Sequence, residues 1–96
     1  MPQFLILAND YKDSEALQRR LSVRELHLQR MREERIKGKF ILGGAKLSES
    51  GQMRGSMLLV DMENEEAVWQ WANQDPYVTG KVWEEITVTP FRIADV

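Results

Sequence analysis

Short apolar runs along the chain predict four β-strands. Residues 3–8, QFLILA, are apolar without a break, are too short for an ordinary helix, and are followed by turn-forming residues from Asn9 onward. KFILGGA and MRGSMLLVD, separated by the polar SESGQ, predict an antiparallel hairpin over residues 39–61. VWEEITVTPFRI is rich in β-branched and aromatic residues and predicts the last strand, with Pro90 indicating an edge or a local irregularity.

The segment from Ser14 to Ile36 has the spacing of an amphipathic helix. Its leucines and one methionine recur at offsets of three, four and seven residues among Arg, Glu and Gln, at positions Leu17, Leu21, Leu28 and Met31. This spacing predicts one apolar stripe on a helix that ends at Gly38. Residues 22–25 match the capping-box pattern, which favours a second helical segment that restarts at Ser22 after a break.

A second helix is predicted after the hairpin. Asn64 is a preferred N-cap residue, and Glu65 and Glu66 would lie in the positive first turn. The apolar face is expected to consist of Ala67, Val68, Trp71 and Ala72. The helix should stop before Pro76, because proline disfavours helical backbone in the residue that precedes it.

The order strand, helix, strand, strand, helix, strand predicts a single α+β domain over residues 1–96. It is the ferredoxin-like βαββαβ arrangement, a four-stranded antiparallel sheet with both helices on one face. The strands do not alternate apolar with polar residues, as a sheet with one wet face should. We therefore expect the open sheet face to pack against the same face of a second subunit, forming a homodimer with a barrel-like core.

The amino-acid composition argues against several classes of partner and cofactor. Thirteen Lys and Arg against 15 Asp and Glu give no electrostatic reason to bind nucleic acid or an anionic membrane. The absence of cysteine excludes disulfides, thiolate metal sites and a cysteine nucleophile. Gly43-Gly44 lacks the lysine of a phosphate-binding loop and favours close backbone packing or a bulge. We expect neither metal nor cofactor, and a cytoplasmic location, because no apolar run could span a bilayer and no leader peptide precedes the first strand.

His27 and Asp75 are the best candidates for chemistry. His27, the only histidine, is either a boundary residue that hydrogen-bonds to water or a general acid/base, since its ordinary pKa lies near neutral pH. Asp75 either caps the turn that begins at Pro76 or orients and charges His27. Sequence spacing leaves open whether the two residues meet within one chain or across subunits.

Other polar residues would bind the substrate. Arg24, one helical turn before His27, either binds a carboxylate or enolate through its guanidinium or pairs with Glu25 or Glu84. The remaining candidates for contact with a small-molecule ligand are Ser22, which is a cap rather than a nucleophile, and Gly44 and Tyr77.

The runs RRLSVRELHLQRM, GGA and WANQDPYVTGKVWEEITVTPF together resemble the YCII-related (YciI-like) family of small bacterial proteins over nearly the whole chain. The resemblance implies a dimeric α+β barrel and an active site with a histidine and an aspartate, which fall on His27 and Asp75, with Arg24 nearby. Part of the family is assigned a dehydrochlorinase role. Ala45 departs from the family pattern, in which proline often follows the glycine.

Two classes of function fit these features. One is a small enzyme of the lyase or isomerase type that uses His27 and Asp75 to abstract a proton from a small organic molecule. The other is a non-catalytic module that binds a small ligand, or regulates, through the same cleft.

Overall fold

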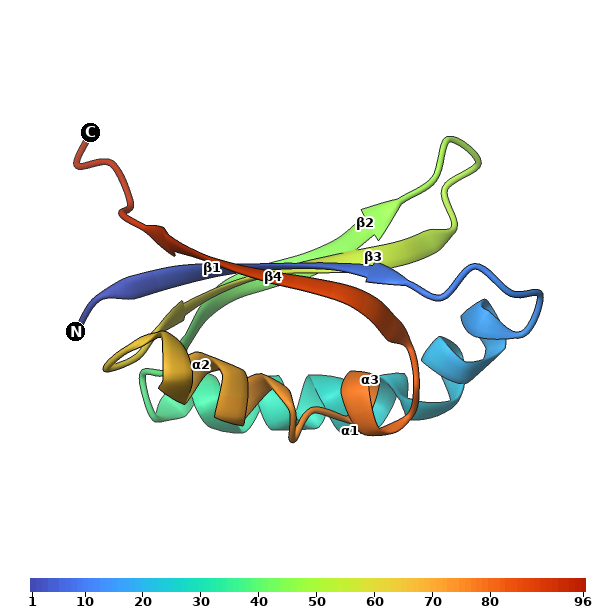
Figure 1. Ribbon diagram of the computed structural model, residues 1–96, viewed down its shortest axis with the longest axis horizontal. Helices are drawn as coiled ribbons and strands as arrows, with labels where there is room; N and C mark the ends of the chain where they lie inside the picture. Colours follow the sequence, from blue (N-terminus) through green and yellow to red (C-terminus); the bar gives the residue numbers. More distant parts are fainter.

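The computed structural model describes residues 1–96 and has the expected order of strands and helices. The elements are β1 (Gln3–Asp10), α1 (Ala16–Ile36), β2 (Phe40–Leu47), β3 (Met53–Asp61), α2 (Glu65–Ala72), α3 (Pro76–Thr79) and β4 (Trp83–Phe91). The strands pair antiparallel in the order β2-β3-β1-β4, and all three helices lie on one face of the sheet (Figure 1). The ferredoxin-like α+β fold is therefore confirmed, and the one-turn helix α3 is an addition to it.

The core lies between the sheet and the helices. In β1, Phe4, Ile6 and Ala8 pair with Val60, Leu58 and Ser56 of β3. All six side chains are buried, because residues that are paired across strands share a face and every second residue points to the same side. From α2, Val68, Trp71 and Ala72 complete this layer as expected, and Asn64 caps the helix by accepting a hydrogen bond from the Ala67 amide at 2.9 Å.

The helix α1 runs without a break, so the predicted restart at Ser22 is wrong. Ser22 lies within the helix, and its hydroxyl donates a hydrogen bond to the carbonyl oxygen of Arg19 at 2.8 Å. A serine inside a helix satisfies its hydroxyl in this way, on a carbonyl of the preceding turn. The helix ends as expected before Gly38, whose φ of 80° is readily adopted only by glycine.

Of the predicted apolar stripe on α1, only Met31 is fully buried. Leu21 is 49% exposed, and the buried side chains are those of Ala16, Arg20, His27, Met31 and Glu34. Arg20, His27 and Glu34 are seven residues apart and therefore lie on one face of the helix. Each has a polar partner on another element, Asp10, Asp75 and Trp71 respectively, which makes their burial tolerable.

No helix covers the opposite face of the sheet (Figure 1). Strand pairing places Leu5, Leu7, Leu42, Met57, Leu59, Thr87, Thr89 and Phe91 there, and we call these eight residues the open face. Polar residues on the same side flank it, among them Asn9, Lys46, Asp61 and Glu85. Leu42 remains 47% exposed and Phe91 44% exposed, so the expected apolar character of both sheet faces is present.

Candidate active site

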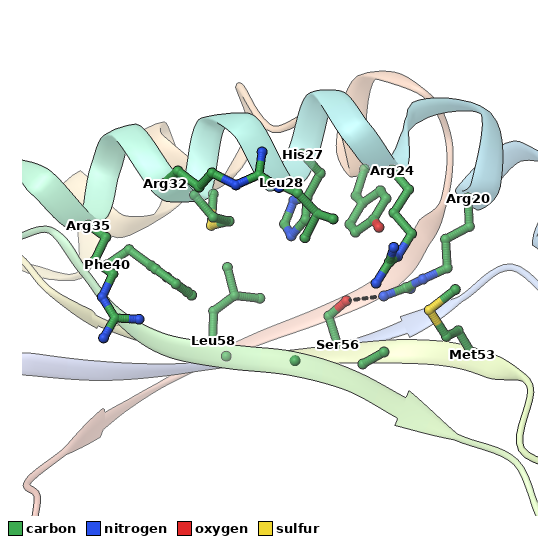
Figure 2. Close-up of a pocket in the computed structure, with 15 residues that line it drawn as sticks. Arg20, Arg24, His27, Leu28, Arg32, Arg35, Phe40, Met53, Ser56 and Leu58 are labelled. Atoms are coloured by element: carbon green, nitrogen blue, oxygen red, sulfur yellow. Dashed lines mark hydrogen bonds between the residues drawn. The ribbon is translucent and has the colours of Figure 1, made fainter.

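A cavity of about 230 Å³ lies between α1 and the sheet. Its apolar wall includes Leu28 and Met31 from α1 and Phe40 and Leu58 from β2 and β3. Figure 2 shows His27 and Arg24 reaching down from the helix, with Ser56 facing them from β3. The cavity thus combines an apolar wall with a few convergent polar groups, which is the usual character of a small-molecule site.

The structure brings His27 and Asp75 together within one chain. His27 Nδ1 lies 2.8 Å from Asp75 Oδ1, although the residues are 48 positions apart. An ionised carboxylate can only accept, so Nδ1 carries the hydrogen and Nε2 of the neutral ring is left as an acceptor. Nε2 has no partner in the chain, and His27 lines the cavity while Asp75, 0% exposed, lies behind it. The ring is therefore held in one orientation at the cavity, with one nitrogen free to accept a hydrogen bond.

Asp75 also caps α3, so the two roles considered from the sequence coexist. Its Oδ1 accepts a hydrogen bond from the Tyr77 amide at 2.9 Å, and Pro76 occupies the first position of the helix. Its Oδ2 accepts from Arg30 at 3.0 Å, while the same guanidinium donates to the Trp71 carbonyl oxygen at 2.7 Å. A carboxylate with this many donors is fixed in position and stays available to the imidazole.

Aromatic rings fix the plane of the imidazole. The Tyr77 ring stacks on His27 with centroids 4.0 Å apart, and Trp83 approaches edge-on at 6.1 Å. Burial raises the pKa of Tyr77, against the opposing effect of Arg20 and Arg24, so the phenol is neutral near pH 7. Its hydroxyl makes no hydrogen bond within the chain, and Tyr77 lines the cavity, as a ligand-binding residue should.

A buried polar network lies behind the sheet side of the cavity. Arg20 donates through Nη1 to both carboxylate oxygens of Asp10, each at 2.9 Å, and through Nη2 to the Ser56 hydroxyl oxygen at 2.7 Å. Trp83 Nε1 donates to the same oxygen at 3.1 Å. Burial raises the pKa of Asp10, and the charge and hydrogen bonds of Arg20 oppose this rise. Arg20 and Ser56 both line the cavity, and sequence analysis missed both.

Weak signals for these two residues exist in the sequence. Arg20 lies seven residues before His27 and therefore on the same side of the helix. Ser56 lies two and four residues before Leu58 and Val60 on the same strand, so it points to the same face of the sheet. It is therefore a polar residue at a position that faces the core. Neither signal identifies a partner.

The other candidates divide between the cavity and the surface. Arg24 lines the cavity and forms no ion pair, so neither Glu25 nor Glu84 is its partner; Glu25 instead pairs with Arg32 at 3.2 Å. Gly44 belongs to the lining. Ser22 does not, because it lies two residues, or about 200°, around the helix from Arg24, and its exposed hydroxyl is bonded to its own helix.

The lining contains four arginines, Arg20, Arg24, Arg32 and Arg35, and no Asp or Glu. Arg20 pairs with Asp10 and Arg32 with Glu25, both outside the lining, so Arg24 and Arg35 carry the positive charge that no ion pair offsets. No cluster of three or more His, Asp or Glu side chains could hold a metal ion. None of the helices combines the length and the apolar character needed to cross a bilayer.

Comparison with solved structures finds an enzyme with a similar fold. The 5-chloro-2-hydroxyhydroquinone dehydrochlorinase of Burkholderia phenoliruptrix AC1100, solved in complex with 2,5-dihydroxybenzoquinone, superposes with a TM-score of 0.81 at 25% sequence identity. The match covers 96% of this chain and 95% of that chain. The similarity therefore extends over the whole fold.

Sequence comparison identifies the family of the chain. Protein YciI of Escherichia coli O6:H1 is 34% identical over 95 residues, covering 93% of this chain and 95% of the relative. A Haemophilus influenzae protein is 33% identical over 96 residues with the same coverage. The family model of the YCII-related domain matches residues 2–92. The chain belongs to the YCII-related family, as the resemblance of its motifs implied.

Proposed function

We propose that this chain is an enzyme in which His27 and Asp75 act as an acid–base pair on a small organic molecule, in an elimination or isomerisation. One observation carries the proposal: Asp75 holds Nδ1 of His27 at 2.8 Å, and Nε2 is left without a partner on the cavity side. A base placed in this way needs no further group to orient it. The positive arginine lining supports a substrate that carries or develops negative charge.

The reaction would begin with proton transfer to Nε2 of His27. The electron pair of the broken bond to hydrogen forms a new double bond, and in an elimination the leaving group departs with its own bonding pair. The imidazolium is stabilised by the Asp75 carboxylate, whose remaining oxygen stays paired with Arg30. His27 then returns the proton, to solvent after an elimination or to another atom of the substrate in an isomerisation.

The Burkholderia dehydrochlorinase suggests the size of the substrate. That enzyme's name describes a chlorinated hydroxyhydroquinone, a single substituted ring. A cavity of roughly 150 Å³ is enough to admit benzene, so the cavity of about 230 Å³ in this chain has room for one substituted ring. We propose that Arg24 and Tyr77 contact the oxygens of such a molecule and that the Gly44 backbone forms part of the wall.

Replacing His27 by glutamine tests the acid–base role. Wild-type protein should release chloride from 5-chloro-2-hydroxyhydroquinone, and His27→Gln should lower kcat at least a hundredfold, because a positioned general base contributes about 10²–10⁴-fold. Glutamine retains a polar side chain that can still meet Asp75. Circular dichroism should show that the variant remains folded. A folded variant with wild-type kcat would reject His27 as the base.

The non-catalytic alternative predicts a different outcome in the same experiment. A module that only binds a ligand would retain the hydroxyhydroquinone without releasing chloride, with or without His27. The placement of an unpartnered ring nitrogen over the cavity favours catalysis over this alternative.

We also propose that two chains associate through the open face. Leu42 and Phe91 are large apolar residues that remain almost half exposed, and a flat apolar sheet surface invites association. A second copy with the same surface would bury it symmetrically. Light scattering should give the mass of two chains at micromolar concentration, and the mass of one chain would contradict the proposal.

A further inference from the structure

Ser56 is a polar residue at the centre of an otherwise apolar layer. It lies on the helix-facing side of β3, pairs across strands with Ala8 and Ala45, and is only 2% exposed. Both of these neighbours are small, and Ser56 is one of the residues that line the cavity. Figure 2 shows Ser56 directly across the cavity from the helix that carries His27, with Arg20 and Arg24 beside it.

The bonds of Ser56 determine what its hydroxyl can still do. Arg20 Nη2 and Trp83 Nε1 both donate to Ser56 Oγ, at 2.7 Å and 3.1 Å. The guanidinium of arginine and the indole N–H of tryptophan can only donate, so Ser56 Oγ is the acceptor in both hydrogen bonds. A hydroxyl has two acceptor sites and one hydrogen, so only the hydrogen remains, and no acceptor of the chain takes it.

The surroundings make this hydrogen a strong donor. The Arg20 guanidinium is charged, and a charged donor on the oxygen polarises the O–H bond. Asp10, the nearest carboxylate in the network, has both oxygens engaged by Arg20. The lining supplies no Asp or Glu as an alternative acceptor, and Arg24 adds a guanidinium without an ion pair.

We propose that Ser56 binds an anionic oxygen of the substrate, of the enolate or phenolate type, from the sheet side of the cavity while His27 acts from the helix side. This inference rests on the acid–base function and adds the group that receives the negative charge. When Nε2 takes a proton from a carbon beside a carbonyl, the C–H electron pair becomes a C=C bond and the carbonyl π pair moves to oxygen. The Ser56 hydroxyl then donates to that oxyanion as it forms.

Binding of 2,5-dihydroxy-1,4-benzoquinone, followed by calorimetry, tests this donor without any turnover. Each hydroxyl of this probe is a vinylogous carboxylic acid, so the molecule is an anion at neutral pH. The matched neutral probe is 2,5-dimethyl-1,4-benzoquinone, in which methyl groups replace the hydroxyls.

Ser56→Ala should weaken binding of the anionic probe about tenfold to a hundredfold, which is the value of a hydrogen bond to a charged group. Its affinity for the dimethyl probe should not change. Ser56→Thr keeps a hydroxyl and should keep most of the affinity for the anion. Equal affinity of wild type and Ser56→Ala for the anion would overturn the proposal, as would a wild type that binds both probes equally.

A second measurement on wild-type protein covers the case in which Ser56→Ala does not fold, since it leaves two donors unpartnered. The chain has three tryptophans, and only the indole of Trp83 donates to Ser56; those of Trp71 and Trp69 donate to Glu34 and Glu65. The anionic probe should therefore shift the Trp83 indole N–H resonance, identified by its loss in Trp83→Phe, far more than the other two. An unshifted Trp83 indole with the anion bound would overturn the proposal.

Failure of this inference is separable from failure of the proposed function. The probes are bound and not turned over, so a result against Ser56 leaves the His27 assay to decide the acid–base role. Conversely, a His27→Gln protein that keeps full activity would reject His27 as the base, while the Ser56 binding data would still stand.

Discussion

Asp75→Ala is expected to lower the free energy of unfolding by about 3–5 kcal/mol, which is the cost of removing one partner from a buried charged pair. Asp75 is 0% exposed and accepts hydrogen bonds from His27, Arg30 and the Tyr77 amide. Alanine would leave the Arg30 guanidinium without its carboxylate and α3 without its cap. Urea denaturation at pH 7 measures the loss, which is large beside the roughly 5–15 kcal/mol of a whole domain.

Two variants serve as controls for Asp75→Ala. Asp75→Asn keeps the shape and an oxygen that can accept from the Tyr77 amide, so its loss of stability should be smaller. Glu25→Ala removes an exposed surface partner of Arg32 and should scarcely change the unfolding curve, because exposed ion pairs contribute little. If Asp75→Ala were as stable as Glu25→Ala, the buried network around His27 would not contribute to stability as described.

Arg20→Met is expected to cost a similar amount, about 3–5 kcal/mol at neutral pH. The side chains of Arg20 and Asp10 are 2% and 4% exposed, so methionine leaves a buried carboxylate without its counter-charge. Methionine preserves much of the volume over the Tyr77 ring, which the guanidinium carbon approaches to 4.5 Å from the centroid. Denaturation of this variant therefore measures mainly the loss of charge and hydrogen bonds.

The deficit of Arg20→Met should depend on pH. Burial raises the pKa of Asp10 above its ordinary value of 3.8 even with Arg20 present, and loss of Arg20 should raise the pKa of folded Asp10 further. A folded pKa above the unfolded one means that protonation favours folding. The deficit should thus be complete at neutral pH and shrink as the pH falls through the folded pKa of Asp10.

Adding Asp10→Asn to Arg20→Met gives the control for this pH dependence. The double variant has no charge in the network, so it should be more stable at neutral pH than Arg20→Met alone. A deficit of Arg20→Met that is the same at neutral and mildly acidic pH would contradict the role given to Asp10.

The elements of the fold could be predicted from the sequence because each has a local cause. The continuous apolar run of β1, the polar SESGQ turn between β2 and β3, and Asn64 at the start of α2 each act over a few residues. The ferredoxin-like arrangement followed from the number and sequence of elements, since few topologies fit them.

The orientation of α1 could not be predicted in the same way. The leucine spacing indicated one buried face, whereas the helix turns Arg20, His27 and Glu34 inward and leaves Leu21 half exposed. Polar residues are buried here because partners from distant segments satisfy them. Hydrophobic spacing does not contain that information.

The candidate site could be predicted only where a local feature of the sequence marks a residue. His27 was identified as the single histidine and Asp75 by its place before proline, and both belong to family motifs. Their contact across 48 positions, the cap on α3 and the donors on Ser56 depend on tertiary packing. Ser22 was considered because it matches a local capping motif, although it lies on the wrong side of the helix, whereas no local motif marks Ser56.

The most direct test of the account is the tautomer of His27, observed by long-range ¹H–¹⁵N correlation in protein with a neutral imidazole. The central claim is that Asp75 accepts a hydrogen bond from the Nδ1–H of His27 and leaves Nε2 unprotonated, as a base toward the cavity. We therefore expect Nδ1 to be protonated and Nε2 to show the chemical shift of an unprotonated nitrogen, and expect this preference to weaken in Asp75→Asn. A neutral ring with its proton on Nε2 in the wild type would contradict the claim.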